Sequence, residues 1–210
     1  TGSIPRPRAA SGRYPTQVRP PVTFLPTRPP LARALAARHY DDPTPVQAAV
    51  LADNAAGRDL LVSAQTGSGK TGAFGIPLAE RLDPARRVLQ ALILVPTREL
   101  AVQVAEVLEP VAMHSGRRVL PVYGGQPIYR QIKELQRGVD VVVATPGRAR
   151  DHVARGTLDL DEVAVVVLDE ADEMLDMGFA EDLEAILAEL PEERQSCLFS
   201  ATLPPRIDAI

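Results

Sequence analysis

The segment Ala64–Thr71, which reads AQTGSGKT, has the residue types and spacing that bind the phosphates of a nucleotide. Gly67 and Gly69 allow successive backbone N–H groups to converge on phosphate oxygens, and the N-terminus of a following helix adds positive potential. In such a loop the Lys70 ammonium contacts the β and γ phosphates, and the Thr71 hydroxyl binds Mg²⁺. The segment therefore predicts a P-loop with a nucleotide and Mg²⁺ as its ligands.

The P-loop pattern is incomplete at its first position, where Ala64 stands in place of glycine. An ordinary glycine-rich turn between a strand and a helix is therefore an alternative. Against it, only two of the 23 basic residues are lysines, Lys70 and Lys133. Because a compact ammonium fits between phosphate oxygens and a broad guanidinium does not, the lysine at position 70 favours a phosphate site.

A second cluster of reactive side chains, Asp169-Glu170-Ala171-Asp172, follows the apolar run Val163–Leu168. Asp169 is suited to hold the water shell of Mg²⁺, and Glu170 to position or deprotonate an attacking water. Acids in the first turn of a helix are also favourable by up to about 1 kcal/mol, so an acidic helix N-terminus is the alternative. A P-loop and a pair of carboxylates at two strand ends together indicate Mg²⁺-nucleotide chemistry.

The apolar pattern that must position these clusters predicts an α/β domain with a parallel sheet. Short β-branched runs, most of them apolar at consecutive positions, alternate with segments of helical periodicity. The expected strands are Asp59–Ala64, Ala91–Val95, Val119–Tyr123, Val139–Ala144, Val163–Leu168 and Ser196–Ser200. The expected helices are Leu31–His39, one starting at Pro45, Gly69–Leu82, Arg98–Met113, Ile128–Arg137, Arg148–Arg155 and Phe179–Leu190. In such sheets ligands bind at the carboxyl ends of the strands, where both clusters lie.

Length and composition indicate one ordinary globular domain of 210 residues, 45% hydrophobic and 24% charged. No apolar run approaches the roughly 20 residues needed to span a bilayer. The single cysteine, Cys197, cannot form an intrachain disulfide, and its apolar surroundings indicate a core thiol. We therefore expect a cytoplasmic protein.

Charge is distributed unevenly, although the net charge is only −4. Residues 1–40 carry seven arginines and no acid, and residues 1–30 also hold eight of the 20 prolines. We expect 1–30 to be a disordered basic arm that either binds RNA or only solvates the domain. Residues 158–193 carry 14 acids and no lysine or arginine, a pattern typical of a solvated helix face.

Taken together, these residues resemble the DEAD-box RNA helicases, whose name is spelled by residues 169–172. The resemblance covers about residues 22–210, and it implies a RecA-like P-loop NTPase domain over 31–210, with a parallel sheet between helices. The motifs follow the family's order: the Q motif at 43–47, the P-loop, motif Ia at 96–100, the GG motif at 124–125, motif Ib at 145–148, the DEAD motif and motif III at 200–202.

The resemblance implies ATP and Mg²⁺ as ligands. The amide of Gln47 would read the adenine edge, the alternative being a polar residue in the first turn of a helix. The implied metal ligands, acting largely through water, are Thr71 and Asp169. The implied catalytic residues are Lys70, Asp169, Glu170 and Asp172. The implied nucleotide-binding residues are Tyr40, Gln47, Gln65, Thr66, Gly67, Ser68, Gly69, Lys70 and Thr71.

The resemblance also implies contact with one RNA strand through its backbone, which is salt-sensitive and independent of sequence. Taken singly, each of these loops also fits an ordinary connection between a strand and a helix. In the family the hydroxyls of Ser200 and Thr202 bond the acids of the DEAD motif, which implies Asp172 here, and couple the domains. A Ser/Thr helix cap is the alternative, and it is compatible with that role. The implied RNA-binding residues are Pro96, Thr97, Arg98, Gly124, Gly125, Thr145, Pro146, Gly147 and Arg148.

The family's second RecA-like domain has no counterpart in this sequence, which ends eight residues after Thr202. By resemblance that domain supplies arginines to the γ-phosphate, a contribution of about 10³–10⁵ in rate for related enzymes. We therefore expect a monomeric chain that binds nucleotide, hydrolyses ATP slowly and unwinds nothing alone. Joined to that domain, it would unwind short RNA duplexes or remodel RNA–protein complexes. An ATP-gated RNA clamp without unwinding, and a P-loop NTPase acting on DNA, are the alternatives.

Overall fold

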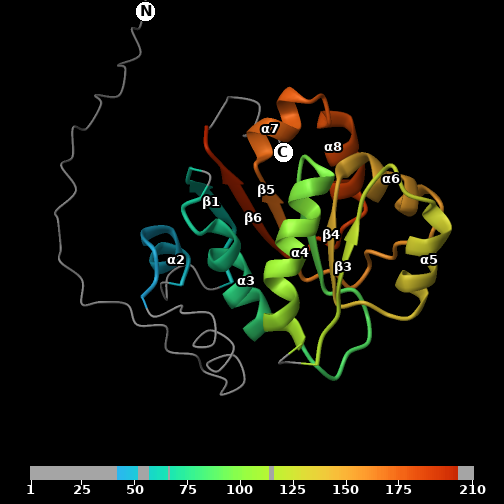
Figure 1. Ribbon diagram of the computed structural model, residues 1–210, viewed down its shortest axis with the longest axis horizontal. Helices are drawn as coiled ribbons and strands as arrows, with labels where there is room; N and C mark the ends of the chain where they lie inside the picture. Colours follow the sequence, from blue (N-terminus) through green and yellow to red (C-terminus); the bar gives the residue numbers. More distant parts are fainter. Residues whose placement is uncertain (1–41, 52–56, 66, 114–115, 203–210) are drawn as a thin grey trace, which may run out of the picture.

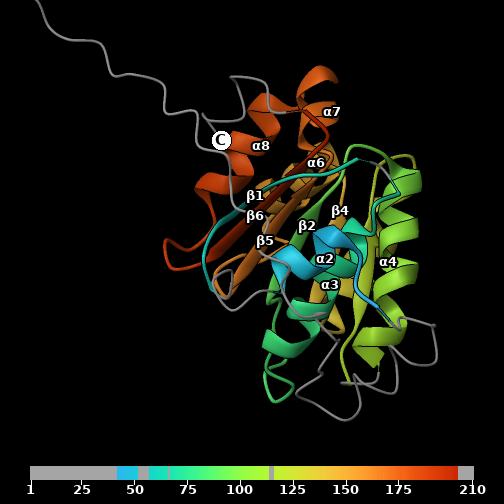
Figure 2. The same ribbon diagram turned by 90° about the vertical axis from the view of Figure 1, so that its left-hand side faces the viewer.

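The computed structural model describes residues 42–51, 57–65, 67–113 and 116–202. In this part of the chain six strands form one parallel sheet with the order β1-β6-β5-β2-β4-β3, and helices cover both faces (Figures 1 and 2). The strands are β1 (Leu60–Ser63), β2 (Ala91–Leu94), β3 (Val119–Val122), β4 (Val141–Ala144), β5 (Val165–Asp169) and β6 (Gln195–Ser200). The helices are α2 (Pro45–Val50), α3 (Lys70–Arg81), α4 (Arg98–Met113), α5 (Ile128–Gln136), α6 (Pro146–Ala154), α7 (Ala171–Asp176) and α8 (Ala180–Ala188). The predicted α/β architecture with a parallel sheet is confirmed.

The central strands are buried on both faces because successive residues point alternately into two hydrophobic cores. On β2, Leu92 belongs to the core closed by α6, α7 and α8, whereas Ile93 belongs to the core closed by α2, α3 and α4. Both side chains are fully buried. The consecutive apolar residues of β2, β4 and β5 thus have the burial that their sequence predicts.

The two edge strands depart from that pattern. Residues of β1 alternate between half-buried and exposed, and three of the four residues of β3 are half-buried. Among the described strands, each edge strand pairs with a neighbour on one side only. This position also explains why β3 tolerates Pro121, which has no N–H to donate to a second strand.

The sequence prediction missed one helix, α7, which begins inside the acidic cluster and is separated from α8 by a turn at Gly178 with a φ of 86°. It also placed the start of α6 two residues late, because Pro146 at the first helical position suits the fixed φ of proline. The expected helix Leu31–His39 and the basic arm lie outside the described residues. No helix within the described ranges is long and apolar enough to cross a membrane.

Candidate functional site

The parallel sheet brings the loops that follow all six strands to one edge, and the strand order sorts them into two groups. Along the chain the three loops of the second group lie between the P-loop and the other two loops of the first, so the fold is what brings the first group together. The neighbouring strands β1, β6 and β5 are followed by the P-loop, by 201–202 and by 170–172. The neighbouring strands β2, β4 and β3 are followed by 95–97, 145 and 123–127. One half of this edge therefore carries the expected nucleotide chemistry, and the other carries the expected RNA contacts.

The P-loop needs glycine at two positions. Gly67 and Gly69 have φ values of 80° and 93°, in the left-handed region that side chains disfavour. At Gly69 a Cβ would also lie 2.7 Å from Nε2 of Gln47 and 2.9 Å from Oγ1 of Thr44. The loop therefore turns tightly into the N-terminus of α3, where the helix dipole and free N–H groups favour an anion.

Gln47 connects helix α2 to the P-loop. Its side chain is only 2% exposed, and its Nε2 donates to the carbonyl oxygen of Gly69 at 3.1 Å. Its Oε1 accepts from the backbone N–H of Thr44 at 2.9 Å. The amide keeps one N–H and one lone pair beyond these two bonds, which is what an adenine edge requires.

Lys70, the first residue of α3, lies at the centre of the site with its side chain 6% exposed. Its Nζ is 3.5 Å from Oδ1 of Asp169 and 3.7 Å from Oε1 of Glu170. These distances hold the ammonium by charge, but they are too long for well-formed hydrogen bonds. No described residue accepts a hydrogen bond from this ammonium, so its three N–H donors are available to a ligand.

Asp169 and Glu170 are both in unfavourable states. The carboxyl of Asp169 is buried, and the backbone of Glu170 has a positive φ. Burial raises the pKa of the Asp169 carboxyl to about 6, although the Lys70 ammonium opposes the rise. Glu170 has a φ of 56° and a ψ of 50°, and within the described ranges it is the only non-glycine residue with a positive φ. Such a conformation costs roughly 1–2 kcal/mol, which indicates that the surroundings hold both side chains in place.

The buried polar atoms of this half that lack a hydrogen-bond partner among the described residues include Ser68 Oγ, Lys70 Nζ and Asp169 Oδ1. Buried polar groups normally have a partner, so these atoms fit a polar ligand. Phosphate oxygens would accept from Lys70 and Ser68. Mg²⁺ keeps several waters and takes one or two carboxylates, so Asp169 with the half-buried Thr71 hydroxyl suits it. The described part of the chain offers no cluster of three or more His, Cys, Asp or Glu side chains to form an all-protein cage.

The segment after β6 is joined to the DEAD motif by hydrogen bonds. The backbone N–H and the hydroxyl of Thr202 donate to Oδ2 of Asp172 at 2.9 and 2.7 Å, and Ser200 Oγ accepts from the backbone N–H of Asp172 at 3.2 Å. Although burial opposes it, hydrogen bonds from Thr202 and Ser200 lower the pKa of Asp172 to about 2. The contact expected between this segment and Asp172 is present, and it fixes the end of β6 to the start of α7.

On the other half of the edge, Thr97 caps helix α4, since its Oγ1 accepts from the backbone N–H of Leu100 at 3.2 Å. Arg98 is exposed and forms an ion pair with its neighbour Glu99. A Cβ built on Gly125 would lie 3.9 Å from the Arg98 guanidinium, so this arginine borders the loop after β3. Gly125 itself has a φ of 81°.

Arg148 differs from the expectation that it faces RNA. Its guanidinium donates to the carbonyl oxygen of Gln126 through both Nη atoms at 3.1 Å, and to Oε1 of Gln131 at 2.8 Å. Its side chain is only 13% exposed. Hydrogen bonds from this arginine thus connect α6 to the loop after β3. A contact with phosphate would be a second role of the same side chain.

Sequence reasoning missed Gln131, a buried residue of α5 that is central to this hydrogen-bond network. Its Nε2 donates to the carbonyl oxygen of Tyr123 at 2.9 Å, and its Oε1 also lies 3.0 Å from Nε2 of His152. His152 is fully buried, its Nδ1 lies 2.8 Å from the Thr157 hydroxyl, and burial lowers its pKa. A glutamine on the apolar side of an amphipathic helix was the signal available in the sequence.

The other predicted residues are less informative. Gln65 and Gly124 are exposed, Pro96 and Pro146 are buried, and Thr145 precedes α6. A Cβ on Gly147 would lie 3.5 Å from Oδ2 of Asp182. Tyr40 and Thr66 lie outside the described residues.

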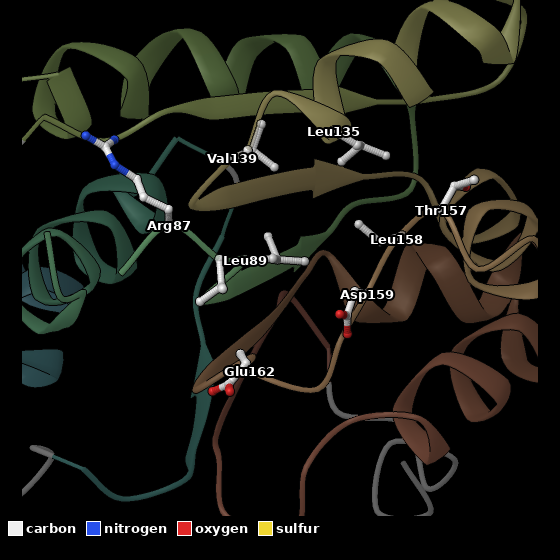
Figure 3. A pocket seen from close by; sticks show the side chains of 10 residues that line it. Arg87, Leu89, Leu135, Val139, Thr157, Leu158, Asp159 and Glu162 are labelled. Carbon is white, nitrogen blue, oxygen red and sulfur yellow. The ribbon is translucent and has the colours of Figure 1, made fainter. Parts of the chain in front are cut away.

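A separate pocket lies at the opposite edge of the sheet, before strands β2, β4 and β5 (Figure 3). Leu89, Leu135 and Val139 give it an apolar lining, and Asp159 and Glu162 lie at its margin. It contains none of the predicted site residues, and it therefore plays no part in the site described above.

Comparison with known proteins agrees with this geometry. The sequence profile of the DEAD/DEAH box helicase family matches residues 44–210. The chain is 51% identical over 178 residues to the DEAD-box ATP-dependent RNA helicase CshA of Geobacillus kaustophilus, covering 85% of this chain and 38% of that protein. It is 51% identical over 182 residues to the ATP-dependent RNA helicase DeaD of Klebsiella pneumoniae, covering 86% and 28%.

A solved structure shares the fold as well as the sequence. The crystal structure of a DEAD box protein from the hyperthermophile Methanococcus jannaschii matches with a TM-score of 0.83 and 40% identity, covering 89% of this chain and 52% of that one. The chain spans less than two fifths of the curated relatives it matches. The profile match, the fold and the arrangement of Lys70, Asp169 and Glu170 lead to one conclusion: this chain belongs to the DEAD/DEAH box helicase family.

Proposed function

We propose that this chain is the ATP-binding and RNA-backbone-binding half of a cytoplasmic DEAD-box ATP-dependent RNA helicase. The observation that carries the proposal is the buried Lys70 ammonium, which lies between Asp169 and Glu170 and has no hydrogen-bond partner among the described residues. A buried cation with unused donors at a helix N-terminus suits the β and γ phosphates of ATP. The high identity to proteins named RNA helicases supports RNA as the second ligand.

The side chains divide the work of ATP hydrolysis. Lys70 and Ser68 donate to phosphate oxygens, and the backbone of the P-loop holds the phosphates against the start of α3. Thr71 and Asp169 would hold Mg²⁺ largely through its water, which would supply positive charge beside the phosphates. Glu170, 3.7 Å from Lys70, orients the attacking water and accepts its proton.

RNA would lie along the other half of the same edge. The N-termini of α4 and α6 and the exposed Arg98 favour phosphates. Thr97, Gly125 and Thr145 would contact the sugar-phosphate backbone, so binding is sequence-independent and weakens as salt rises. The hydrogen bonds from Arg148 to the loop after β3 support this proposal, because they fix the position of that loop relative to the start of α6.

Complete turnover would need a second RecA-like domain, which the greater length of the relatives allows. We propose that Ser200 and Thr202, through Asp172, report nucleotide state to that domain. This chain alone would bind nucleotide as a monomer and hydrolyse ATP slowly, which a turnover assay with and without RNA measures. Slow release of RNA by the two-domain protein, without strand separation, would favour the ATP-gated clamp instead.

A comparison of nucleotides that differ only in their base tests the proposal. ADP is expected to bind this chain at least about tenfold more tightly than GDP, the effect of one or two hydrogen bonds. In Gln47→Ala both nucleotides are expected to bind more weakly, because Gly69 loses its donor, and the preference for ADP is expected to disappear. Calorimetric titrations with Mg²⁺ give both constants.

The ratio of the two affinities isolates base reading, because both nucleotides place the same diphosphate on the loop. The matched control is Thr44→Val. The side chain of Thr44 lies beside Gly69, as that of Gln47 does, but it has no amide that could recognise the base. It is expected to leave the ADP/GDP ratio unchanged. Equal binding of ADP and GDP by the unchanged chain would contradict adenine recognition and favour a base-indifferent NTPase.

A further inference from the structure

The outer face of α5 carries an exposed aromatic residue among exposed cations. Tyr129 is 63% exposed, and Arg130 and Lys133 are also exposed. The opposite side of the helix packs inward through the buried Gln131 and the half-buried Leu135. Packing of α5 against the domain therefore explains the types of its inner residues, but it does not explain why these three outer positions carry an aromatic ring and two cations.

None of the three outer side chains makes a hydrogen bond or ion pair with another described residue. Among the described residues the two cations have no partner, even though an acid lies on the same helix. That acid, Glu134, is already paired with Arg118 and Arg137. Within the part of the chain that the structure describes, the face of α5 therefore carries positive charge that no acid compensates, although the chain as a whole is acidic.

This face is fixed next to the loop after β3. Gln131 is bonded to the carbonyl oxygen of Tyr123, and Arg148 to that of Gln126, so both ends of that loop are tied to α5 and α6. Tyr129 follows Gly125 by four residues, at the first turn of the helix. Figure 1 shows α5 at the margin of the molecule beside β3. Because α5 begins directly after this loop, an RNA strand bound at the loop would lie close to the first turn of α5.

We propose that the outer face of α5 extends the RNA-binding surface, with Tyr129 stacking on a base of a single-stranded segment while Arg130 and Lys133 contact its phosphates. An aromatic side chain among free cations has the chemistry that binds single-stranded nucleic acid without sequence preference. The proposal rests on the proposed function, because it places RNA at the neighbouring loop. It adds a contact to bases, which backbone recognition by the loops alone does not provide.

The test compares oligoadenylates of about six and about twelve nucleotides, binding to the 210-residue chain by fluorescence anisotropy. Tyr129→Ala is expected to weaken binding of the longer RNA about fivefold to tenfold, with a smaller effect on the shorter one. Tyr129→Phe is expected to retain the affinity, because the stacking ring remains. Removing both Arg130 and Lys133 is expected to reduce the slope of log K against log salt by about 1.4.

Arg87→Ala is the matched control, since Arg87 is exposed at the opposite edge of the sheet beside the pocket of Figure 3. It is expected to change neither affinity nor salt slope. If the unchanged chain binds neither RNA, the proposed function and this inference both fail. If it binds both RNAs and Arg98→Ala weakens both, while the Tyr129 and double variants match the unchanged chain, the inference on α5 alone is wrong.

Discussion

Replacing Asp169 with asparagine is expected to raise the free energy of unfolding at pH 7 by up to about 3 kcal/mol, measured without Mg²⁺. The reason is the buried carboxyl, whose pKa rises from an ordinary value of 3.8 to about 6 on folding. Keeping it ionised at pH 7 opposes folding. Asparagine has the same shape without that charge.

The pH dependence separates this explanation from one based on packing. Because the pKa of Asp169 is higher in the folded state, the folded protein binds more protons than the unfolded chain between about pH 4 and pH 6. Its contribution to stability therefore falls as the pH rises through that window. The gain from Asp169→Asn is expected to be full at pH 7 and to vanish below about pH 4.

Urea unfolding at a series of pH values measures the effect, and Asp176→Asn is the matched control. Asp176 is an exposed acid in the same region, and its replacement is expected to change stability by less than about 0.5 kcal/mol. A gain for Asp169→Asn that stays constant from pH 4 to pH 7 would indicate packing instead of charge. A loss of stability at pH 7 would contradict the prediction.

Replacing Lys70 with methionine is expected to weaken binding of Mg²⁺-ADP by about 100-fold or more. The Nζ atom is buried, has no hydrogen-bond partner among the described residues, and lies 3.5 Å from Asp169. Two charge-assisted hydrogen bonds to phosphate oxygens, each contributing about 1.5–3 kcal/mol, account for this loss. Methionine keeps the length and apolar stem of the side chain but removes every donor.

Calorimetric titration measures this affinity, and circular dichroism checks that the variant is folded. Arg87→Met removes a cation of similar length at the opposite edge of the sheet and is expected to bind Mg²⁺-ADP like the unchanged chain. Undiminished binding by a folded Lys70→Met chain would show that the loop backbone alone holds the phosphates. The proposed role of the ammonium would then be wrong.

Both predictions concern a site that holds side chains in states unfavourable for folding. The carboxyl of Asp169 is ionised where burial opposes ionisation, and Glu170 has a left-handed backbone conformation. Such features persist when surrounding contacts hold them and when a ligand uses them. Stability and ligand binding are therefore expected to change in opposite directions at Asp169.

Much of the fold could be predicted from local sequence patterns. Runs of consecutive apolar residues predicted the buried central strands, and a period of 3.6 residues predicted helices such as α4 with the bounds that the structure gives. Gly67 and Gly69 predicted the tight turn of the P-loop, because few other residues adopt a positive φ. Short-range signals failed at α7, a helix of six residues with four acids in and immediately before it, for which the sequence pattern predicted no separate helix.

The chemical identity of the site was therefore a property of the sequence, since motifs such as Gly67–Thr71 and Asp169–Asp172 are contiguous and their spacing is local. Its geometry was decided by the tertiary structure. The bond from Gln47 to Gly69, the raised pKa of Asp169 and the use of Arg148 inside the protein all involve residues far apart in the chain or depend on burial. Strand order likewise places the loop after β1 beside the loops after β5 and β6, which are about 100 residues away or more in the chain, and so forms the nucleotide half. Packing between distant segments determines these features, and no local period or propensity in the sequence encodes it.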